Sequence, residues 1–341
     1  MRVLFLKRVI KIRILIIHTA FIGDVVLSTP LIKKIKDTYP DSELTYLTTP
    51  VGATILRNNP NINHIIEYDK RGKHKGISGL LGVGKKLRME AYDMVITPHR
   101  YLRSSFLTWL TAAKDRRGYD NAGGKIFYNK KIHYDKSKHE VEKLLSFIPE
   151  GKNKRYEIEL FPGKIEKNKI DKILNKDKEK IVVIAPGSKW FTKKWPLEYF
   201  NEVIKHLEKK ENLRLVIVGG KEEKLLDLKI SNPKTLDLRG KTTLLELAEV
   251  ISRGDIILTN DSSPIHIASA FKDTHIIAIF GPTVKEFGFF PWSKNSEVFE
   301  IEGLECRPCG IHGGNICPKK DFRCMRDIKP ELVINRIEEL L

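Results

Sequence analysis

The sequence has no apolar run that approaches the roughly 20 residues of a membrane-spanning helix. Near its start, Lys7, Arg8, Lys11 and Arg13 interrupt the apolar residues, and the unbroken segment 14–17 is shorter than the roughly 7–15 residues of a secretory signal core. These two features argue against an integral membrane protein and against a secreted one. We therefore expect a cytoplasmic protein, and its 341 residues suggest about two domains.

Cysteine is scarce, and all four cysteines follow position 305. This excludes the class of small secreted proteins that disulfides hold together. Cys306 and Cys309 have the spacing of a zinc knuckle, with His312 nearby. The second pair, Cys317 and Cys324, is separated by six residues, whereas structural zinc usually takes two close pairs. Because the match is incomplete, we expect free thiols or a clip rather than a metal site.

Complete nucleotide-loop motifs are also missing. The segment Gly79–Lys86, GLLGVGKK, nearly spells a phosphate-binding loop, but Lys86 stands where magnesium binding needs serine or threonine. Leu87 replaces the third glycine of a dinucleotide fingerprint. We therefore predict a flexible basic loop here and disfavour a phosphate-loop ATPase. Zinc-finger spacing and aromatic RNA-binding signatures are absent as well, so no nucleic-acid partner is expected.

Basic residues, by contrast, are abundant. The chain carries 61 Lys and Arg against 43 Asp and Glu, which gives a formal net charge of +18. Such an excess favours association with polyanions or with an anionic membrane surface. A set of solvated surface lysines is the alternative, and net charge alone leaves both open.

The first half of the chain alternates apolar runs with helical patterns, of which Pro30–Tyr39 is the clearest. This alternation is typical of crossover units and predicts an α/β fold with a mostly parallel sheet. The predicted strands are Arg13–His18, Glu43–Thr48, His64–Tyr68 and Met94–Thr97.

A lysine-rich segment between Glu150 and Lys180 separates this half from a second one, and we place a domain boundary there. The same alternation then restarts, with helical patterns at Glu198–Lys209 and Thr243–Ser252. Two α/β halves predict two sheets that face a cleft. The strands predicted in the second half are Ile181–Ala185, Leu213–Val218, Ile256–Thr259 and Ile276–Phe280.

An aspartate follows the first predicted strand, in the segment HTAFIGDVVLSTP at residues 18–30. Open α/β sheets bind their ligands at the carboxyl edge of the strands, and Asp24 is predicted to lie at that edge. Gly23 allows a tight turn before it. The alternative is that Asp24 only caps the helix that follows.

Two later segments have the composition of anion-binding turns. In APGSKWFTKKWP, residues 185–196, small residues leave a strand and are followed by hydroxyl and basic side chains. In TNDSSPIHIASA, residues 259–270, polar residues precede a helix that Pro264 begins. An ordinary basic loop and a simple helix cap with a surface histidine are the alternatives. Two such turns in one half favour a nucleotide diphosphate, with candidate ligands Ser188, Lys189, Thr192, Lys193, Asp261, Ser262, Ser263 and His266.

The order of these segments resembles the ADP-heptose:lipopolysaccharide heptosyltransferase family, glycosyltransferase family 9, over nearly the whole chain. The FGPT of Phe280–Thr283 and the late CRPC belong to the same pattern. The resemblance implies a GT-B fold of two Rossmann-like domains with the active site between them. It implies an acceptor-binding domain at 1–165, a nucleotide-sugar-binding domain at 166–327, and a C-terminal helix at 328–341 that packs back on the first domain. Residues 1–10 precede the usual family start.

Site roles follow from the resemblance residue by residue. Asp24 falls on the family's catalytic base, and Lys193 on the lysine that meets the donor's diphosphate. Ser188 falls on a phosphate-binding hydroxyl, and residues 261–266 fall on the second diphosphate loop, where the family more often has glycine at the position of Ser263. Glu222 or Glu223 falls near the ribose-binding acid, and the sequence leaves the two open. Glu222 is the residue we place in the predicted site.

The implied reaction moves a heptose from ADP-heptose to the Kdo and heptose region of the lipopolysaccharide inner core, with inversion at the anomeric carbon. No Asp-x-Asp pair occurs in the sequence, so we predict metal-independent transfer without a cofactor. The expected partners are the nucleotide sugar, an anionic lipopolysaccharide precursor and, peripherally, the cytoplasmic face of the inner membrane. Within the family, the late cysteines favour the enzyme that adds the second heptose.

Three other functions remain open at this point. A nucleotide-sugar epimerase on the same fold would act on the donor without an acceptor. A transferase of another sugar would share both halves of the site. A non-catalytic nucleotide or glycan binder would lack turnover, although Asp24 and Lys193 argue against it.

Overall fold

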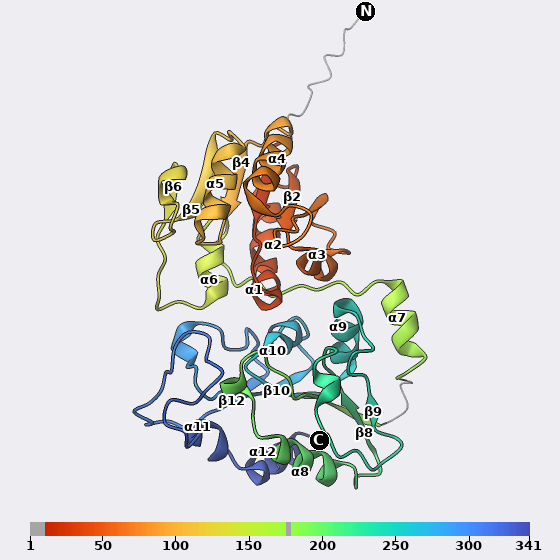
Figure 1. Ribbon diagram of the computed structural model, residues 1–341. Coiled ribbons are helices and arrows are strands. Elements are labelled where there is room, and N and C mark those ends of the chain that lie inside the picture. The colour runs from red at the N-terminus through yellow and green to blue at the C-terminus, as the bar shows by residue number, and fades with distance from the viewer. Residues whose placement is uncertain (1–10, 175–178) are drawn as a thin grey trace, which may run out of the picture. The chain divides into compact units, whose positions relative to one another are not determined.

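The computed structural model describes residues 11–174 and 179–341, so residues 1–10, which precede the usual family start, lie outside the described residues. Figure 1 labels the helices and strands along the chain. The chain forms two compact units: the first takes Met1–Asp135 and Val141–Tyr156, and the second takes Lys136–Glu140 and Glu157–Leu341.

The first unit is built on a six-stranded sheet in which every paired strand is parallel, in the order β3-β2-β1-β4-β5-β6. The strand order reverses between β1 and β4, and such a switch point is where open α/β sheets place their ligands. The four strands predicted in this half are confirmed, and two more polar ones are added. The strands are β1 (Arg13–Ile17), β2 (Glu43–Thr48), β3 (His64–Glu67), β4 (Met94–Thr97), β5 (Asp115–Tyr119) and β6 (Lys130–Ile132).

The segment Gly79–Lys86 lies inside a helix, and the predicted flexible loop is therefore wrong. Leu80, Val83 and Leu87 are buried at helical spacing, and they pack against the sheet residues Leu15 and Ile17. The helices are α1 (Ile22–Leu27), α2 (Thr29–Thr38), α3 (Pro50–Leu56), α4 (Gly76–Met89), α5 (Leu102–Leu110), η1 (Lys125–Phe127) and α6 (Glu140–Leu145).

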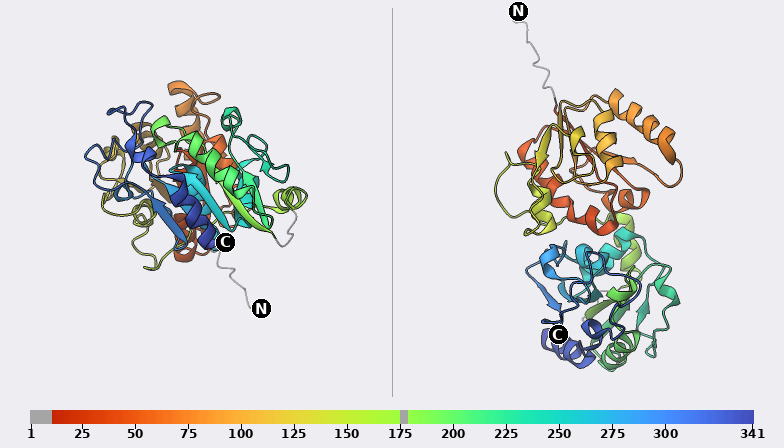
Figure 2. Two further views of the ribbon diagram at one scale, coloured as in Figure 1. Left: turned by 90° about the horizontal axis from the view of Figure 1, so that it is seen from below. Right: turned by 60° about the vertical axis from the view of Figure 1, so that its left-hand side comes forward.

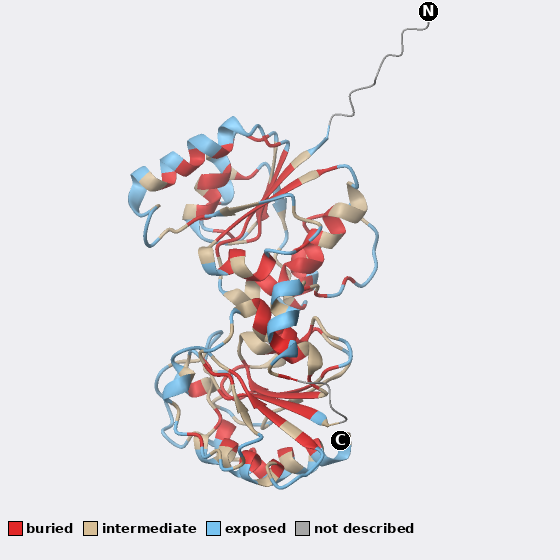
Figure 3. Ribbon diagram, turned by 90° about the vertical axis from the view of Figure 1, so that its right-hand side faces the viewer, coloured by how far each residue is buried: buried red, intermediate tan, exposed pale blue. Residues whose placement is uncertain are grey.

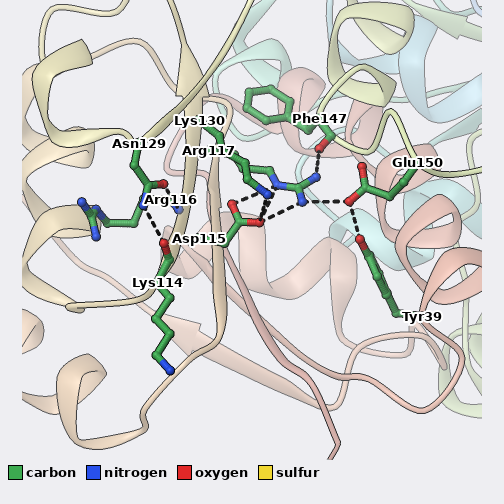
Figure 4. Close-up of polar contacts among 9 residues, drawn as sticks. All are labelled: Tyr39, Lys114, Asp115, Arg116, Arg117, Asn129, Lys130, Phe147 and Glu150. Atoms are coloured by element: carbon green, nitrogen blue, oxygen red, sulfur yellow. Dashed lines mark hydrogen bonds and ion pairs between the residues drawn. The ribbon is translucent and has the colours of Figure 1, made fainter.

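The polar strand β5 is held by a buried arginine, as the close-up in Figure 4 shows. Arg117 donates to the Phe147 carbonyl at 2.6 Å, to Asp115 Oδ2 at 2.9 Å and to Glu150 Oε1 at 2.8 Å. Burial opposes ionisation of Glu150, but hydrogen bonds from Arg117 and Tyr39 lower its pKa to about 2. These contacts pair the charged side chain that β5 buries, whereas an apolar strand would have no charged group to pair.

The second unit repeats the architecture, with a parallel sheet in the order β12-β11-β10-β7-β8-β9. Its switch point lies between β7 and β10, and the central strands of both sheets are buried along most of their length, whereas the outermost strands are not (Figure 3). The four strands predicted here are confirmed. The strands are β7 (Lys180–Ala185), β8 (Leu213–Ile217), β9 (Leu236–Asp237), β10 (Ile256–Asn260), β11 (His275–Ile279) and β12 (Ser296–Phe299).

The second long segment of the second unit begins at Glu157, nine residues before the expected start at 166, so the first helix after it lies in the second unit. That helix, α7, packs against α9. The helices of the second unit are α7 (Lys164–Asp171), η2 (Phe191–Lys193), α8 (Leu197–Leu207), η3 (Glu223–Leu225), α9 (Leu244–Arg253), α10 (Ser263–Ala268), η4 (Lys285–Phe287), α11 (Arg323–Arg326) and α12 (Pro330–Leu340).

The C-terminal helix α12, which the resemblance placed against the first domain, lies beside α8 in the second unit (Figures 1 and 2). Val333 and Ile337 are fully buried in the same apolar cluster as Phe200 and Ile204 of α8. The helix thus has its apolar face covered within the second unit.

The second unit also takes in the short segment Lys136–Glu140. The Glu140 amide donates to the Gly288 carbonyl at 2.8 Å, and His139 Nε2 lies 2.9 Å from the Phe290 carbonyl. The His139 ring also packs on Phe290 and Trp292, with ring centroids 4.6 Å apart in each case. Five residues from the first half of the chain are therefore part of the second fold.

Among the described residues, no helix combines the length and the apolar character needed to cross a bilayer.

Candidate functional site

Asp24 lies in the first turn of α1, just beyond the carboxyl end of β1. The strand order reverses beside β1, so this is the ligand-binding edge of the first sheet. Asp24 is half-buried, and its Oδ2 accepts a hydrogen bond from the Phe21 amide at 3.2 Å. The carboxylate therefore caps α1 while it stands at the edge where a substrate would bind.

A buried polar network lies under α1. Tyr46, from β2, has its hydroxyl 2.6 Å from Ser28 Oγ and 3.1 Å from His18 Nδ1. Ser28 also donates to the Val25 carbonyl at 2.7 Å. Burial lowers the pKa of His18 to about 3 and raises that of Tyr46, so both side chains are neutral at pH 7. The network fixes the end of α1 against the sheet, and with it the helix that carries Asp24.

A second set of polar residues surrounds the same edge. Lys70, from the loop after β3, donates to the Thr19 carbonyl at 2.9 Å. His99, after β4, lies 3.0 Å from Ser104 Oγ, and its ring centroid is 6.2 Å from that of His18. Burial, with the charges of Lys70 and Arg100, lowers the pKa of His99 to about 4. Sequence reasoning missed these residues; their signal was a polar residue directly after each apolar strand.

In the second unit, three loops bring a lysine, an aspartate and a threonine together. Lys193 Nζ lies 2.6 Å from Asp261 Oδ2, and Thr283 Oγ1 donates to the same oxygen at 2.6 Å. Only 12% of the Lys193 side chain and 6% of the Asp261 side chain are exposed. The loops follow β7, β10 and β11, which are neighbours in the sheet. The two predicted anion-binding turns therefore meet at one edge.

The serines join the same two turns. Ser262 donates to the Gly187 carbonyl at 3.2 Å, which links the loop before α10 to the loop after β7. Ser188 is buried in that second loop, and Ser263 begins α10 half-buried. Lys189 is exposed, and its Nζ lies 5.4 Å from the Trp190 ring centroid. Of the predicted basic residues, Lys193 is the one held inside the site.

His266 is buried and is not a surface histidine. Its Nδ1 has no hydrogen-bond partner among the described residues. Burial lowers its pKa to about 4, while Asp261 opposes and Lys193 reinforces the shift. A neutral imidazole thus lies beside the pair formed by Lys193 and Asp261 at pH 7.

Thr192 has its hydroxyl engaged within the chain. It donates to the Gly314 carbonyl at 2.9 Å and accepts from the Gly314 amide at 2.7 Å. The Thr192 amide also donates to that carbonyl at 2.9 Å. The loop that carries the cysteines therefore clasps the segment that carries Lys193, and these contacts support a positioning role for Thr192 rather than a donor-binding one.

The two acids after β8 differ in placement. Glu223 Oε2 accepts from the Gly220 amide at 2.7 Å, and its side chain lies so close to Gly187 that a Cβ there would come within 2.4 Å of it. Glu222, the acid chosen from the sequence, is exposed. Glu223 is the acid that lies against the loops of the second-unit site.

The four cysteines are free thiols, and Cys324 is buried. Burial, reinforced by the neighbouring cysteines, raises the pKa of Cys324 to about 12 and that of Cys309 above its usual value. In the described part of the chain, no three His, Cys, Asp or Glu side chains form a group that could hold a metal ion. The Cys309 amide donates to the Pro282 carbonyl at 2.9 Å, which ties this segment to the loop after β11.

Comparison with known proteins places these features in a family. The family described as glycosyltransferase family 9 (heptosyltransferase) matches residues 80–313. Lipooligosaccharide heptosyltransferase 2 of Campylobacter jejuni (strain 81116) is 27% identical over 327 residues, which cover 94% of this chain and 96% of the relative.

Two solved structures have the same fold. A glycosyl transferase of family 9 from Veillonella parvula has a TM-score of 0.84 at 23% identity and covers 96% of both chains. The ADP-heptose lps heptosyltransferase II of Escherichia coli has a TM-score of 0.80 at 20% identity, with 96% of this chain and 98% of that one covered. The predicted architecture of two Rossmann-like units is confirmed by this likeness.

Proposed function

Because the chain belongs to glycosyltransferase family 9, the heptosyltransferases, we propose that it transfers a heptose from ADP-heptose to the inner core of lipopolysaccharide. The similarity to a lipooligosaccharide heptosyltransferase 2 and to an ADP-heptose heptosyltransferase II supports this donor and this acceptor class, and it favours addition of the second heptose. The first unit binds the acceptor and the second binds the nucleotide sugar. The observation that carries the proposal is the buried pair of Lys193 and Asp261 at the ligand-binding edge of the second sheet.

The donor's diphosphate binds at this pair. The diphosphate gains negative charge as the glycosidic bond breaks, and Lys193 provides a cation held in place by Asp261 before the donor arrives. Thr283 fixes the Asp261 carboxylate from its other side. Ser188 and Ser263 lie in the two adjoining turns and bind phosphate oxygens. Glu223 lies beside Gly187 and binds the ribose.

Asp24 acts as the general base. It takes the proton from an acceptor hydroxyl as that oxygen attacks the anomeric carbon, and the electron pair of the broken bond leaves with the diphosphate. The hydrogen bond from the Phe21 amide holds the carboxylate in one orientation. A single base opposite the leaving group gives inversion. The reaction requires Asp24 to contact the acceptor hydroxyl and Lys193 to contact the diphosphate of the donor that this hydroxyl attacks.

Cations at the edge of the first sheet suit an anionic acceptor. Lys70 contacts Thr19, five residues before Asp24, and Arg100 follows His99 in the loop after β4. These charges attract the carboxylates and phosphates of a lipopolysaccharide precursor. Because that precursor is anchored in lipid, we also propose peripheral association with the cytoplasmic face of the inner membrane.

A transfer assay tests the function. Purified protein is incubated with ADP-heptose or with UDP-sugars, and with a Kdo-bearing lipid acceptor that either carries or lacks a first heptose. We expect one heptose to be added, seen by mass spectrometry, with release of ADP. Conversion of the nucleotide sugar without an acceptor, or transfer only from another sugar donor, contradicts the proposal.

A further inference from the structure

The helix α4 and the segment before it form the most strongly basic stretch of the first unit. Residues 70–89 contain seven Lys and Arg residues and no Asp or Glu. Six of the seven are exposed, and only Lys70 is half-buried. This stretch includes the near-match to a phosphate loop, and the proposed transfer reaction leaves most of it unused. The exposed basic residues are Arg71, Lys73, Lys75, Lys85, Lys86 and Arg88.

Large apolar side chains are exposed on the same helix. Ile77 is 75% exposed and Leu81 is 45% exposed, one helical turn apart, and Lys85 follows one turn later. The core-facing side of α4 is separate and consists of Leu80, Val83, Gly84 and Leu87. On a helix whose outer side contacts only water, polar residues lie opposite the core face. The exposed apolar side chains of Ile77 and Leu81 therefore indicate that this side of α4 contacts an apolar partner.

The neighbouring helix α5 extends this surface. The two helices lie side by side (Figures 1 and 2), and a Cβ on Gly84 would come within 2.5 Å of Leu110 Cδ1. On α5, Leu102 is 58% exposed and Trp109 is 50% exposed, two turns apart on one side of the helix. We call the exposed residues on this side of the two helices, together with the two lysines just before α4, the α4–α5 face, which consists of Lys73, Lys75, Ile77, Leu81, Lys85, Arg88, Leu102 and Trp109.

The α4–α5 face begins at the edge of the sheet that carries Asp24. Arg103 of α5 donates to the carbonyls of His74 and Gly76, both at 3.0 Å, and so ties the start of α4 to α5. Lys70, a few residues earlier, contacts Thr19 in the loop that leads to Asp24. A surface bound by this face is therefore close to the proposed base.

We propose that the α4–α5 face docks the first unit onto an anionic phospholipid bilayer. The lysines meet lipid phosphates, and Ile77, Leu81 and Trp109 enter the interface between headgroups and acyl chains, where such amphipathic surfaces bind. The apolar residues distinguish a bilayer from a nucleic acid, whose phosphate backbone offers them no partner. The inference rests on the proposed function in one respect, because docking brings the enzyme to an acceptor that is anchored in lipid.

Vesicle sedimentation of the full-length protein tests the docking. We expect binding to vesicles of phosphatidylethanolamine with phosphatidylglycerol, weak binding to phosphatidylcholine vesicles, and a decline as salt is added. The double variants Lys85→Gln with Arg88→Gln and Ile77→Ser with Leu81→Ser should each weaken binding about fivefold or more.

Matched controls change similar residues outside the face. Ile165→Ser removes an apolar side chain that is 80% exposed on α7, and Lys205→Gln with Lys209→Gln removes two charges from the second unit. These variants should bind vesicles like the unaltered chain. Circular dichroism and urea unfolding establish that all variants are folded.

The outcomes separate docking from transfer. Heptosyl transfer to a deacylated, water-soluble acceptor should be unchanged in the face variants, while transfer to an acceptor embedded in anionic vesicles should fall. Vesicle binding that depends on the face in a chain without transfer activity contradicts the proposed function and leaves docking intact. Equal binding to phosphatidylcholine overturns the docking proposal. So does full binding by the Ile77 and Leu81 variant when the Lys85 and Arg88 variant has lost it, because that result indicates a site for polyanions in general.

Discussion

At the scale of a single residue, the proposal gives Asp24 two roles, since it accepts from the Phe21 amide and is the proposed general base. Asp24→Asn keeps an oxygen for that amide and removes the proton acceptor. We expect kcat to fall about 10²–10⁴-fold, with little change in KM for ADP-heptose, because general-base contributions have this size. Initial rates of transfer measure it, and Asp41→Asn at an exposed turn is the control. A rate within twofold of the unaltered chain would show that Asp24 is only a cap.

Replacing Lys193 with a neutral residue tests its proposed role at the diphosphate. Lys193→Gln removes the cation that meets the leaving diphosphate, and we expect kcat/KM to fall about 10²–10³-fold, as for other lost electrostatic donors. The affinity for ADP, measured by calorimetry, should fall as well, because the same phosphates bind in the product. Lys205→Gln, on the outside of α8, is the matched control. Unchanged ADP affinity would place the diphosphate elsewhere.

The buried histidine His266 makes stability depend on pH. Its pKa is about 4 in the folded chain, below the ordinary value of 6.5, so the unfolded chain binds a proton that the folded chain does not. Stability is therefore full above pH 6.5 and is lost as the pH falls towards 4. Between pH 6.5 and 5 this histidine should cost up to about 2 kcal/mol of unfolding free energy.

Urea unfolding at the two pH values measures this loss. In His266→Gln, which cannot titrate, the loss between pH 6.5 and 5 should shrink by the same amount. His18 and His99 contribute in the same direction, so part of the loss persists in the variant. An equal loss in both chains would show that His266 is not desolvated.

At the scale of elements, we predict opposite effects on stability when two glycines of α4 are replaced by alanine. Gly84 lies against Leu110, and Gly84→Ala should destabilise the chain by about 1–3 kcal/mol because its Cβ overpacks the contact with α5. Gly82 has no atom near its would-be Cβ, and Gly82→Ala should stabilise by about 0.5–1 kcal/mol through helix propensity. Urea unfolding of both variants provides the comparison. Unfolding free energies that change in the same direction in both variants would contradict the packing of Gly84 against Leu110.

The elements that the sequence predicted well are the strands with continuous apolar runs, because parallel strands are buried on both faces. The missed strand β5 reads DRRGY, and its stability depends on Arg117 meeting Glu150, 33 residues away. The missed helix α4 contains glycines that suggest a loop, and only the approach of α5 explains Gly84. The resemblance, and not the residues, implied where the C-terminal helix packs, because an amphipathic pattern shows which side of a helix is covered but not by what; in the structure α8 covers it.

The candidate site likewise contains residues that the sequence predicted and residues that it missed. Asp24, Lys193 and Asp261 were found because each follows an apolar run, and their positions at strand ends need no knowledge of distant contacts. His18, Tyr46 and Ser28 were missed because their network exists only once β1, β2 and α1 are placed together. Thr192 was predicted as a donor ligand because it offers a hydroxyl in a basic turn, and its contact with Gly314, 122 residues away, could not be seen in the sequence.

At the scale of the whole molecule, the proposal has the protein itself neutralise the charge that develops on the leaving diphosphate. The sequence has no Asp-x-Asp pair, and Lys193 supplies the cation at the proposed diphosphate site. We therefore expect transfer to persist in excess EDTA at an unchanged rate, measured by release of ADP. Loss of activity that added Mg²⁺ restores would show that a divalent ion shares this task.

The segment Lys136–Glu140, which lies in the second fold while the chain on both sides of it lies in the first, limits how the protein can be divided. A gene fragment that starts at residue 157 encodes a donor half without His139 and Glu140, which pack on Phe290 and Gly288. A chimaera that exchanges donor halves between relatives must therefore carry this five-residue piece along with the rest, and a single crossover point cannot do so.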